Sequence, residues 1–262
     1  MVWIHTIDPV LISIGPLRIH WYGVMYVLAF LFAYWYVRRR IRQEKTALTL
    51  EQLDSLMVWL VVALIIGARL FEVLFWQPGY YFAHPVEILA IWKGGLSFHG
   101  SLVAMIITAY ILARRFGLSL LSLGDLLIVP LSLGQAFGRM GNFINGELFG
   151  RVTSLPWGVN FGGETDAFGQ LVFRHPNQLY EVAYNVVIFV VLWLLRDRGL
   201  RPGSLLAIWL ILYAVFRFCT EFLRVGEPSL LGLTLGQVFN IVMCIAGSAI
   251  LYYQYRQSPK PL

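Results

Sequence analysis

SLMVWLVVALIIGARLFEVLFW, residues 55–76, settles which class of fold this chain can adopt. Only two of its side chains, Arg69 and Glu72, carry a charge. A helix needs about 20 predominantly apolar residues, with a range of roughly 17–25, to cross the hydrocarbon core of a bilayer. The run therefore predicts a membrane-spanning helix.

The composition of the whole chain extends this prediction. Of its 262 residues, 58% are hydrophobic and 13% are charged, and the mean hydropathy is +0.70. A soluble domain carries about 25% charged residues. The net charge of +6 could suggest a nucleic-acid partner, but the basic residues flank apolar runs, where they act as topology signals. We therefore expect a single polytopic membrane domain over residues 1–262, with lipid and not nucleic acid as its surroundings.

Seven stretches have the length and apolar character of a spanning helix. Their ranges are 19–37, 55–76, 97–113, 125–145, 178–195, 203–222 and 236–253. The fourth is unusual because it contains Pro130 and several glycines. The predicted fold class is an all-α integral membrane protein with about seven transmembrane helices and a small polar region at one face.

The distribution of Lys and Arg predicts the orientation. One set of connections, which includes residues 38–52, holds twelve of them, and the opposite set holds five. Positive residues stay on the cytoplasmic side, so the N-terminus is expected outside and the C-terminus in the cytoplasm. The long connections 77–96 and 146–177 then lie at the outer face. The first of them reads as an amphipathic, interfacial segment.

Three arginines fall inside predicted spans, at one depth. Arg69, Arg139 and Arg217 each follow the cytoplasmic start of their helix by a distance of roughly 21 Å at 1.5 Å rise per residue. Ionisable residues inside a membrane are costly and usually functional. Arg69 can pair with Glu72, and Arg217 with Glu221 four residues on. Each pair could be structural, but the shared depth also makes Arg69 a substrate-binding candidate.

Arg139 has no acid within four residues along its helix, so it needs an anion from elsewhere. Arg suits bidentate phosphate binding, and phospholipid headgroups are the abundant anions at that depth. The run GRMGNFINGELFG, residues 138–150, contains Gly141, Asn142, Asn145 and Gly146, which are poor membrane-helix residues. We expect the helix to unwind there and to form a glycine-lined phosphate cradle.

Three further runs lie at the predicted outer interface. WKGGLSFHGS, residues 92–101, places His99 in the first turn of a helix, where it is either a structural hydrogen-bonding group or a base. RHPNQLYE, residues 174–181, has Pro176 at a helix start. HWYG, residues 20–23, opens the first helix, and its Trp21 fits an interfacial aromatic belt.

These runs resemble the signatures of the bacterial prolipoprotein diacylglyceryl transferase family. GRMGNFINGELFG is similar to the family signature, and GGLSFHGSL resembles its HGG-type motif with Ser101 in place of the second glycine. HWYG, RHPNQLYE and YAVFRFCTEFLR (residues 213–224) match in the expected order. The resemblance covers nearly the whole chain and implies seven spans in the bacterial cytoplasmic (inner) membrane, with the active site facing the periplasm.

The resemblance also implies a reaction. The lipobox cysteine of a prolipoprotein signal segment attacks the glyceryl carbon of phosphatidylglycerol, a thioether forms and glycerol 1-phosphate leaves. No nucleotide, metal or other cofactor takes part. Carried over by position, the catalytic candidates are His99 as base and Arg139 and Arg217 on the phosphate side. Other positions that match functional residues of the family are Tyr22, Asn142, Glu147, Gly150, Tyr213 and Glu221.

Two other classes of function compete with this interpretation. A transporter or flippase for an anionic lipid or solute would also need intramembrane arginines, but such sites usually lie near the midplane and arise from internal repeats. Here the polar residues fall in the outer half and no repeat is visible. A membrane scaffold without activity would not account for three arginines at one depth. The sequence therefore favours the transferase.

Overall fold

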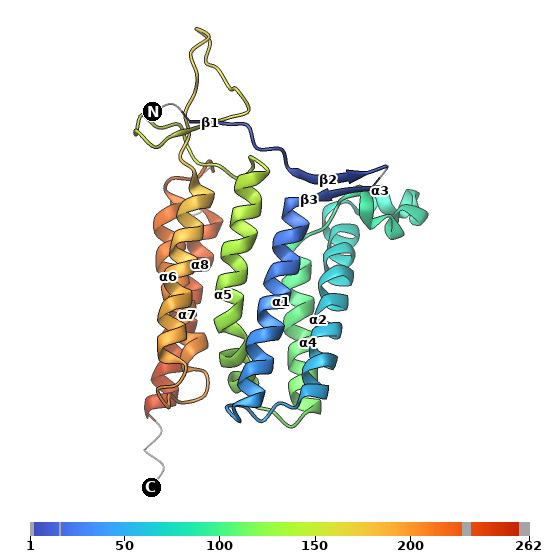
Figure 1. Cartoon of the computed structure of the whole chain (residues 1–262), viewed down its shortest axis with the longest axis vertical. Helices are drawn as coiled ribbons and strands as arrows, with labels where there is room; N and C mark the ends of the chain where they lie inside the picture. The colour runs from blue at the N-terminus through green and yellow to red at the C-terminus, as the bar shows by residue number, and fades with distance from the viewer. Residues whose placement is uncertain (1–2, 16, 227–231, 257–262) are drawn as a thin grey trace. The chain divides into compact units, whose positions relative to one another are not determined.

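The computed structural model describes residues 3–15, 17–226 and 232–256, which are mostly helical (Figure 1). The described part includes long helices that overlap all seven predicted spans. These are α1 (Trp21–Arg42), α2 (Leu50–Phe71), α4 (Phe98–Arg115), α5 (Leu120–Ile144), α6 (Asn177–Leu195), α7 (Ser204–Glu221) and α8 (Leu235–Arg256). Helix α5 continues through Pro130, so the least regular of the predicted spans is one helix.

Five of these helices are long and apolar enough to cross a membrane. They are α5, α6, α7, α8 and the combined stretch of α2 with the π-helical turn η1 (Glu72–Trp76). Helices α1 and α4 have 22 and 18 residues but are less apolar. Helix α1 ends in a run of arginines, and α4 begins near His99 and ends at Arg114 and Arg115. The mostly helical fold is confirmed, and the five apolar helices agree with a multi-pass membrane protein, while the number of seven crossings and their orientation stay predictions.

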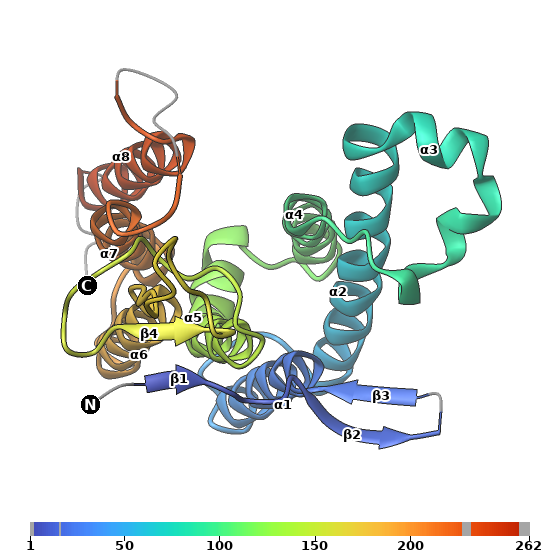
Figure 2. The same ribbon diagram turned by 90° about the horizontal axis from the view of Figure 1, so that it is seen from above.

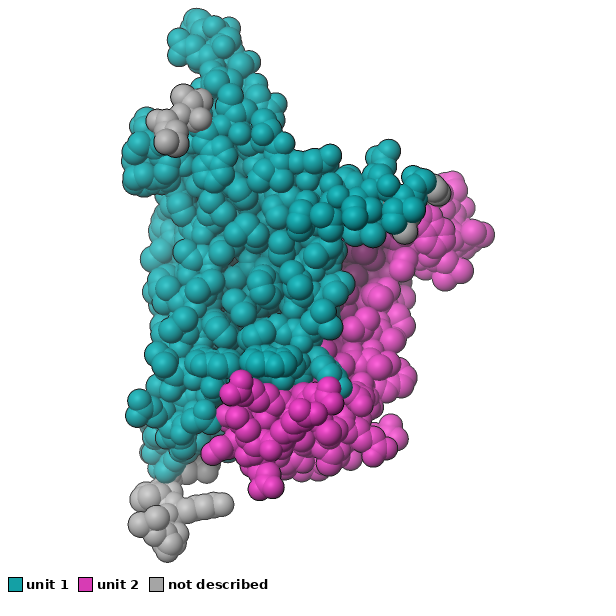
Figure 3. Space-filling model, in the orientation of Figure 1, with its two compact units in different colours: residues 1–36, 124–262 teal, residues 37–123 magenta. Residues whose placement is uncertain are grey.

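The chain forms two compact units, coloured separately in Figure 3. Unit 1 comprises Met1–Tyr36 and Gly124–Leu262, and unit 2 comprises Val37–Leu123. Compact units are defined by packing alone, and the single membrane domain over 1–262 stays a prediction.

In unit 1, helices α5 to α8 run alongside one another with alternating direction (Figures 1 and 2). One end of this group holds the start of α7, and we call it the inner end. The opposite end holds residues 145–177, and we call it the outer end. There the strand β1 (Trp3–His5) pairs in parallel with β4 (Val159–Phe161). Val159 and Phe161 of β4 form a small buried core with Phe143 of α5. The strands β2 (Val10–Ile14) and β3 (Leu17–His20) form an antiparallel hairpin that leads into α1.

In unit 2, α2 and α4 pack closely and run antiparallel. A Cβ atom at Gly67 or at Gly100 would overlap the backbone of the other glycine, so only glycine permits this approach. The Ser101 hydroxyl donates to the Leu64 carbonyl oxygen at 3.0 Å across the same contact. The glycine and serine of the HGS run therefore join two helices. Helix α2 begins at a capping box, in which the Thr49 side chain accepts from the Gln52 backbone N–H.

The connection predicted to be interfacial forms three short helices, α3 (Pro78–Ala83), η2 (Pro85–Leu89) and η3 (Ile91–Lys93). Large apolar side chains project from it: Phe82, Val86, Leu89 and Trp92 are 69%, 82%, 75% and 79% exposed. Exposed apolar groups on short helices are typical of a segment that lies in a lipid interface.

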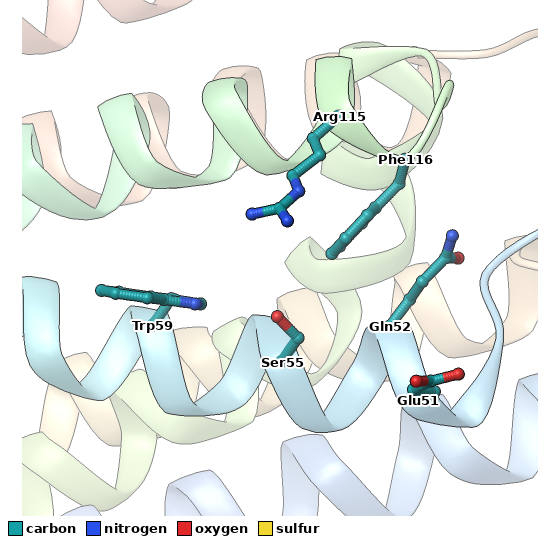
Figure 4. A pocket seen from close by; sticks show the side chains of 6 residues that line it. All are labelled: Glu51, Gln52, Ser55, Trp59, Arg115 and Phe116. Atoms are coloured by element: carbon teal, nitrogen blue, oxygen red, sulfur yellow. The ribbon is translucent and has the colours of Figure 1, made fainter.

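An open pocket of about 420 Å³ lies where α2 begins and α4 ends (Figure 4). Arg115 and Phe116 line it from α4 and its C-cap, opposite Glu51, Gln52, Ser55 and Trp59 of α2. None of these is a predicted site residue. The pocket lies at the far ends of these two helices from Gly67 and Gly100.

Candidate active site

A buried carboxylate, that of Glu181 in the second turn of α6, is the centre of the polar cluster in unit 1. Its side chain is 1% exposed, and its Oε2 lies 2.6 Å from Nε of Arg139 on α5. Arg139 thus has an anion from another helix, as its sequence surroundings required. That anion is a protein carboxylate, whereas the sequence pointed to a lipid headgroup; binding of a lipid phosphate by Arg139 stays a prediction.

Two more arginines reach the same carboxylate. Nη1 of Arg224, just past α7, lies 3.2 Å from Oε1 of Glu181, and Nη1 of Arg217 lies 3.8 Å from it. Arg217 also forms the predicted pair with Glu221, at 2.5 Å. The Thr234 hydroxyl donates to Glu221 at 3.1 Å. The cluster therefore joins α5, α6 and α7 at their outer ends, together with the segment that leads into α8.

A hydrogen-bonded chain extends from Arg139 to the loop that follows α5. Nη1 of Arg139 donates to Oδ1 of Asn142 at 3.3 Å, and Nδ2 of Asn142 donates to Glu147 at 2.8 Å. Asn145 donates to the same carboxylate oxygen of Glu147. Helix α5 stays regular through Ile144, so within the stretch expected to unwind Gly141 and Asn142 are helical, whereas Asn145 and Gly146 form a turn as predicted. A helical Asn142 faces Arg139 because residues three apart share a helix side.

Two tyrosines lie near this cluster. The Tyr213 ring stacks on Trp209, at 5.0 Å between centroids, and its hydroxyl is close enough to Arg139 to interact with the charge. Tyr22 on α1 shares a 3.2 Å hydrogen bond with the hydroxyl of Tyr26. A Cβ at Gly141 would lie 2.8 Å from the Tyr22 ring. Gly141 therefore permits close packing of α1 against α5.

Gly150 serves the backbone of the outer loop. Its N–H donates to the His175 carbonyl oxygen at 2.8 Å, and a Cβ there would lie 2.5 Å from the Leu223 carbonyl oxygen. Any larger side chain at this position would clash with the backbone at Leu223 and with His175. Gly150 thus ties residues 146–177 to the end of α7, and its assignment to substrate binding stays a prediction.

Arg69 lies in unit 2, and loop carbonyls take up its donors. It is 5% exposed and donates to the carbonyl oxygens of Ile88 at 2.8 Å, Gly94 at 2.8 Å and Gly95 at 2.9 Å. It also bonds the Tyr81 hydroxyl at 3.0 Å and the carbonyls of Glu87 and Ala90. Among the described residues, no ion pair joins it to Glu72. The contacts show a side chain that organises residues 77–96.

His99, also in unit 2, is exposed at the start of α4. Its ring centroid lies 6.3 Å from that of Phe71 and 6.5 Å from that of Trp76. The Trp76 indole N–H donates to the Ser97 hydroxyl, which orients this aromatic group. In the described part of the chain no hydrogen bond engages the imidazole, so both ring nitrogens are open to a substrate.

One ion pair of the outer loop stands apart from the cluster. Arg174 contacts Glu164 through Nε at 2.7 Å and Nη2 at 2.5 Å. Hydrogen bonds from Arg174 lower the pKa of the Glu164 carboxyl below its ordinary value of 4.5. The stabilisation of the loop by this ion pair is therefore fully present above about pH 4.5. It is lost as the pH falls through the lowered pKa of Glu164.

Glu181 and Arg224 were not singled out from the sequence, although both lie in runs that were. The signal for Glu181 was present: it is the only charged residue of α6, and an acid in an apolar helix is costly unless paired. Arg224 lies beyond the predicted sixth span and reads as a solvated loop residue.

The cluster can bind an anion. Three guanidinium groups, those of Arg139, Arg217 and Arg224, surround two carboxylates, those of Glu181 and Glu221. This leaves one positive charge in excess, while Glu147 joins only through Asn142 and is itself exposed. Planar guanidinium groups match a phosphate oxygen pair. Within the described ranges, no group of His, Cys, Asp or Glu side chains has the geometry of a metal site.

Comparison with known proteins identifies similar chains. The family model described as prolipoprotein diacylglyceryl transferase matches residues 9–253. A phosphatidylglycerol–prolipoprotein diacylglyceryl transferase of Nitrosomonas europaea is 44% identical over 263 residues, which cover 97% of this chain and 92% of the relative. Proteins with the same name from Bordetella avium and Cupriavidus necator are each 40% identical. They cover 97% and 96% of this chain, and 97% and 94% of their own lengths are matched.

Proposed function

The chain belongs to the prolipoprotein diacylglyceryl transferase family, and we propose that the arginine cluster at the outer ends of α5, α6 and α7 is where it binds the phosphate of its lipid substrate. The enzyme transfers the diacylglyceryl group of phosphatidylglycerol to a prolipoprotein, the first step of lipoprotein maturation. It is a multi-pass protein of the bacterial inner membrane.

The reaction is an alkyl transfer from oxygen to sulfur, and it needs no oxidant or reductant. The sulfur of the lipobox cysteine forms a bond to the glyceryl carbon that carries the phosphate. The bond between that carbon and the phosphate oxygen breaks, and its electron pair leaves with glycerol 1-phosphate. The thiol proton goes to a base. The phosphodiester carries one negative charge, and a second develops on the leaving oxygen in the transition state.

Arg139 and Arg217 stabilise that second charge. Preorganised donors aimed at developing charge in a water-poor site are usually the largest contribution to catalysis. The main support for this assignment is that both guanidinium groups lie close to Glu181, although they come from different helices. Glu181 aligns them without cancelling the excess positive charge. Tyr213 and Asn142 interact with Arg139, and Glu147 accepts a hydrogen bond from Asn142.

Deprotonation of the thiol is the second task. A thiol with a pKa of about 8.5 is only slightly ionised at neutral pH. We assign the proton to His99, whose imidazole makes no hydrogen bond within the described residues and lies near the exposed Trp76 and the partly exposed Phe71 at the start of α4. An apolar signal segment would carry its cysteine to such a surface.

The proposed topology has seven crossings with the N-terminus outside. Support comes from the alternating direction of α5 to α8, from the antiparallel pair α2 and α4, and from the arginines in the last turns of α1 and α4. Helices α1 and α4 would be about 33 Å and 27 Å long at 1.5 Å per residue, close to the thickness of the hydrocarbon core. The cluster then faces the periplasmic side.

The test uses purified protein, a synthetic lipobox peptide and vesicles of defined lipid. With phosphatidylglycerol we expect a thioether product and stoichiometric glycerol phosphate, measured by mass spectrometry. With phosphatidylethanolamine the rate should be low, because its headgroup carries an extra positive charge next to the arginine cluster. Equal rates from the two lipids would contradict the proposed reading of the headgroup.

A further inference from the structure

The N-terminus of α7 is capped by a residue of another helix. Oδ2 of Asp125, on α5, accepts from the Gly203 N–H at 2.7 Å, and Oδ1 accepts from the Leu206 N–H at 2.8 Å. The first N–H groups of a helix have no partner within the helix and are usually satisfied by a local N-cap side chain. The N-cap of α7 is Gly203, at φ 89°, which has no side chain to offer. Helix α7 therefore depends on α5 for its cap.

The position of this cap relates it to the active site. Arg139 follows Asp125 by fourteen residues along α5, and Arg217 follows Gly203 by fourteen residues along α7. Both helices are continuous over these segments and run in the same direction. Fourteen residues rise about 21 Å in each helix. A cap that joins Asp125 to Gly203 at the inner end therefore brings the two arginines to one height at the outer end.

Contacts at both ends agree with this register. Near the cap, a Cβ at Gly124 would lie 3.0 Å from the Leu206 side chain, so the two helices touch there. At the outer end, Glu181 lies 2.6 Å from Arg139 and 3.8 Å from Arg217. Helices α5 and α7 are thus fastened at two levels, directly at the inner end and through α6 at the outer end.

We propose that Asp125 is a positioning residue that sets the axial register of α7 against α5, so that Arg139 and Arg217 reach the same phosphate. The inference rests on the proposed function of the arginine cluster. Without the cap, α7 loses its direct hydrogen bonds to α5, and an axial shift of one residue moves Arg217 by about 1.5 Å. A misplacement of about 1 Å can cost on the order of 100-fold in rate.

The experiment compares KM for phosphatidylglycerol in the purified full chain and its variants. Asp125→Ala should raise KM about 10-fold or more, since a 1.4 kcal/mol loss of binding is tenfold. A smaller folded fraction lowers Vmax and leaves KM unchanged, so KM separates misplacement from instability. Asp125→Asn keeps one side-chain oxygen as acceptor and should give an intermediate KM. If the alanine variant does not fold, the asparagine variant alone decides.

The matched control is Thr49→Ala, which removes a side-chain cap from the N-terminus of α2. The Thr49 cap is local and does not connect α2 to another helix. It should lower the thermal midpoint without a change in KM. A double-mutant cycle with Arg217→Lys completes the test. In that background Asp125→Ala should add little to KM, because the group that it positions has already been changed.

Three outcomes would overturn the proposal. One is an unchanged KM in both Asp125 variants. Another is full additivity of Asp125→Ala with Arg217→Lys. If Arg217→Lys alone leaves both KM and kcat unchanged, the phosphate assignment fails and the register proposal falls with it. If Arg217→Lys raises KM and the Asp125 variants do not, only the register proposal falls.

Discussion

Arg139 on α5 and Glu181 on α6 form an ion pair of 2.6 Å between Nε and Oε2, inside a membrane-spanning bundle. The carboxylate is almost fully buried, whereas the Arg139 side chain is 26% exposed. The guanidinium is thus fixed on one side and open on the other. That arrangement is suited to a group that must hold still while it binds a second anion.

Glu181→Gln should therefore lower both activity and stability. The change keeps the shape of the side chain but leaves three arginines near a neutral amide, and breaking a buried pair costs about 3–5 kcal/mol. We expect thioether formation to fall by at least about tenfold, since each 1.4 kcal/mol is a factor of ten, together with a lower thermal midpoint in detergent. Glu164→Gln, in the partly exposed pair with Arg174, is the control and should have only a small effect. Equal effects of the two variants would show that the buried cluster has no special role.

Arg139→Lys should nearly abolish transfer while protein level stays close to normal. Lysine keeps the charge but lacks the planar fork that now bonds Glu181 and Asn142 at once. Arg217→Lys should be milder, because Glu221 can hold a lysine as well. Turnover and membrane abundance are measured side by side. If Arg139→Lys protein is lost from the membrane, the arginine is a folding element and not a phosphate ligand.

Arg69→Lys should disturb the interfacial connection more than the chemistry. The guanidinium bonds several carbonyls of residues 85–95, and an ammonium group cannot satisfy them together. Hydrogen exchange in residues 77–96 should rise and the thermal midpoint should fall, with KM for phosphatidylglycerol unchanged. Arg115→Lys in the same unit serves as the control. A raised KM with unaltered exchange would instead restore Arg69 as a substrate-binding residue.

His99→Gln should cut turnover by about 10²–10⁴-fold, the usual contribution of a general base, and leave lipid binding intact. The remaining activity should increase with pH up to about 9, where an unperturbed thiol is mostly ionised without help. The measurement is a pH–rate profile for the wild type and the variant. A variant that gains nothing at high pH, or that fails to bind the lipid, would make His99 a positioning group.

The topology can be checked by labelling intact cells with an impermeant thiol reagent. In a background without Cys219 and Cys244, a cysteine at Phe168 should react and one at Gln43 should not. Phe168 is 89% exposed in the loop 146–177, and Gln43 follows the arginine-rich end of α1. Labelling only after the cells are opened should reveal Gln43. The reverse pattern would invert the proposed orientation.

The sequence by itself determined the class of fold, the approximate span of each long helix and the family. Apolar length and the flanking arginines carry that information locally, because a bilayer imposes the same length on every crossing. The i,i+4 pair of Arg217 with Glu221 was likewise predictable, since the helix period alone brings the two side chains together. The anion for Arg139 was not predictable in this way, because its partner Glu181 is 42 positions away and on another helix.

Only the tertiary structure decided how the three intramembrane arginines are used. Their common depth suggested one shared site, yet Arg69 is bonded by the carbonyls of its own connecting loop, while Arg139 and Arg217 meet at Glu181. Depth along an axis follows from residue counting. Which face of a helix meets which neighbour depends on packing, and here on the glycines at 67, 100 and 141 that allow helices to approach and on the cap from Asp125 to α7. These contacts join residues far apart in the chain, and no local pattern encodes them.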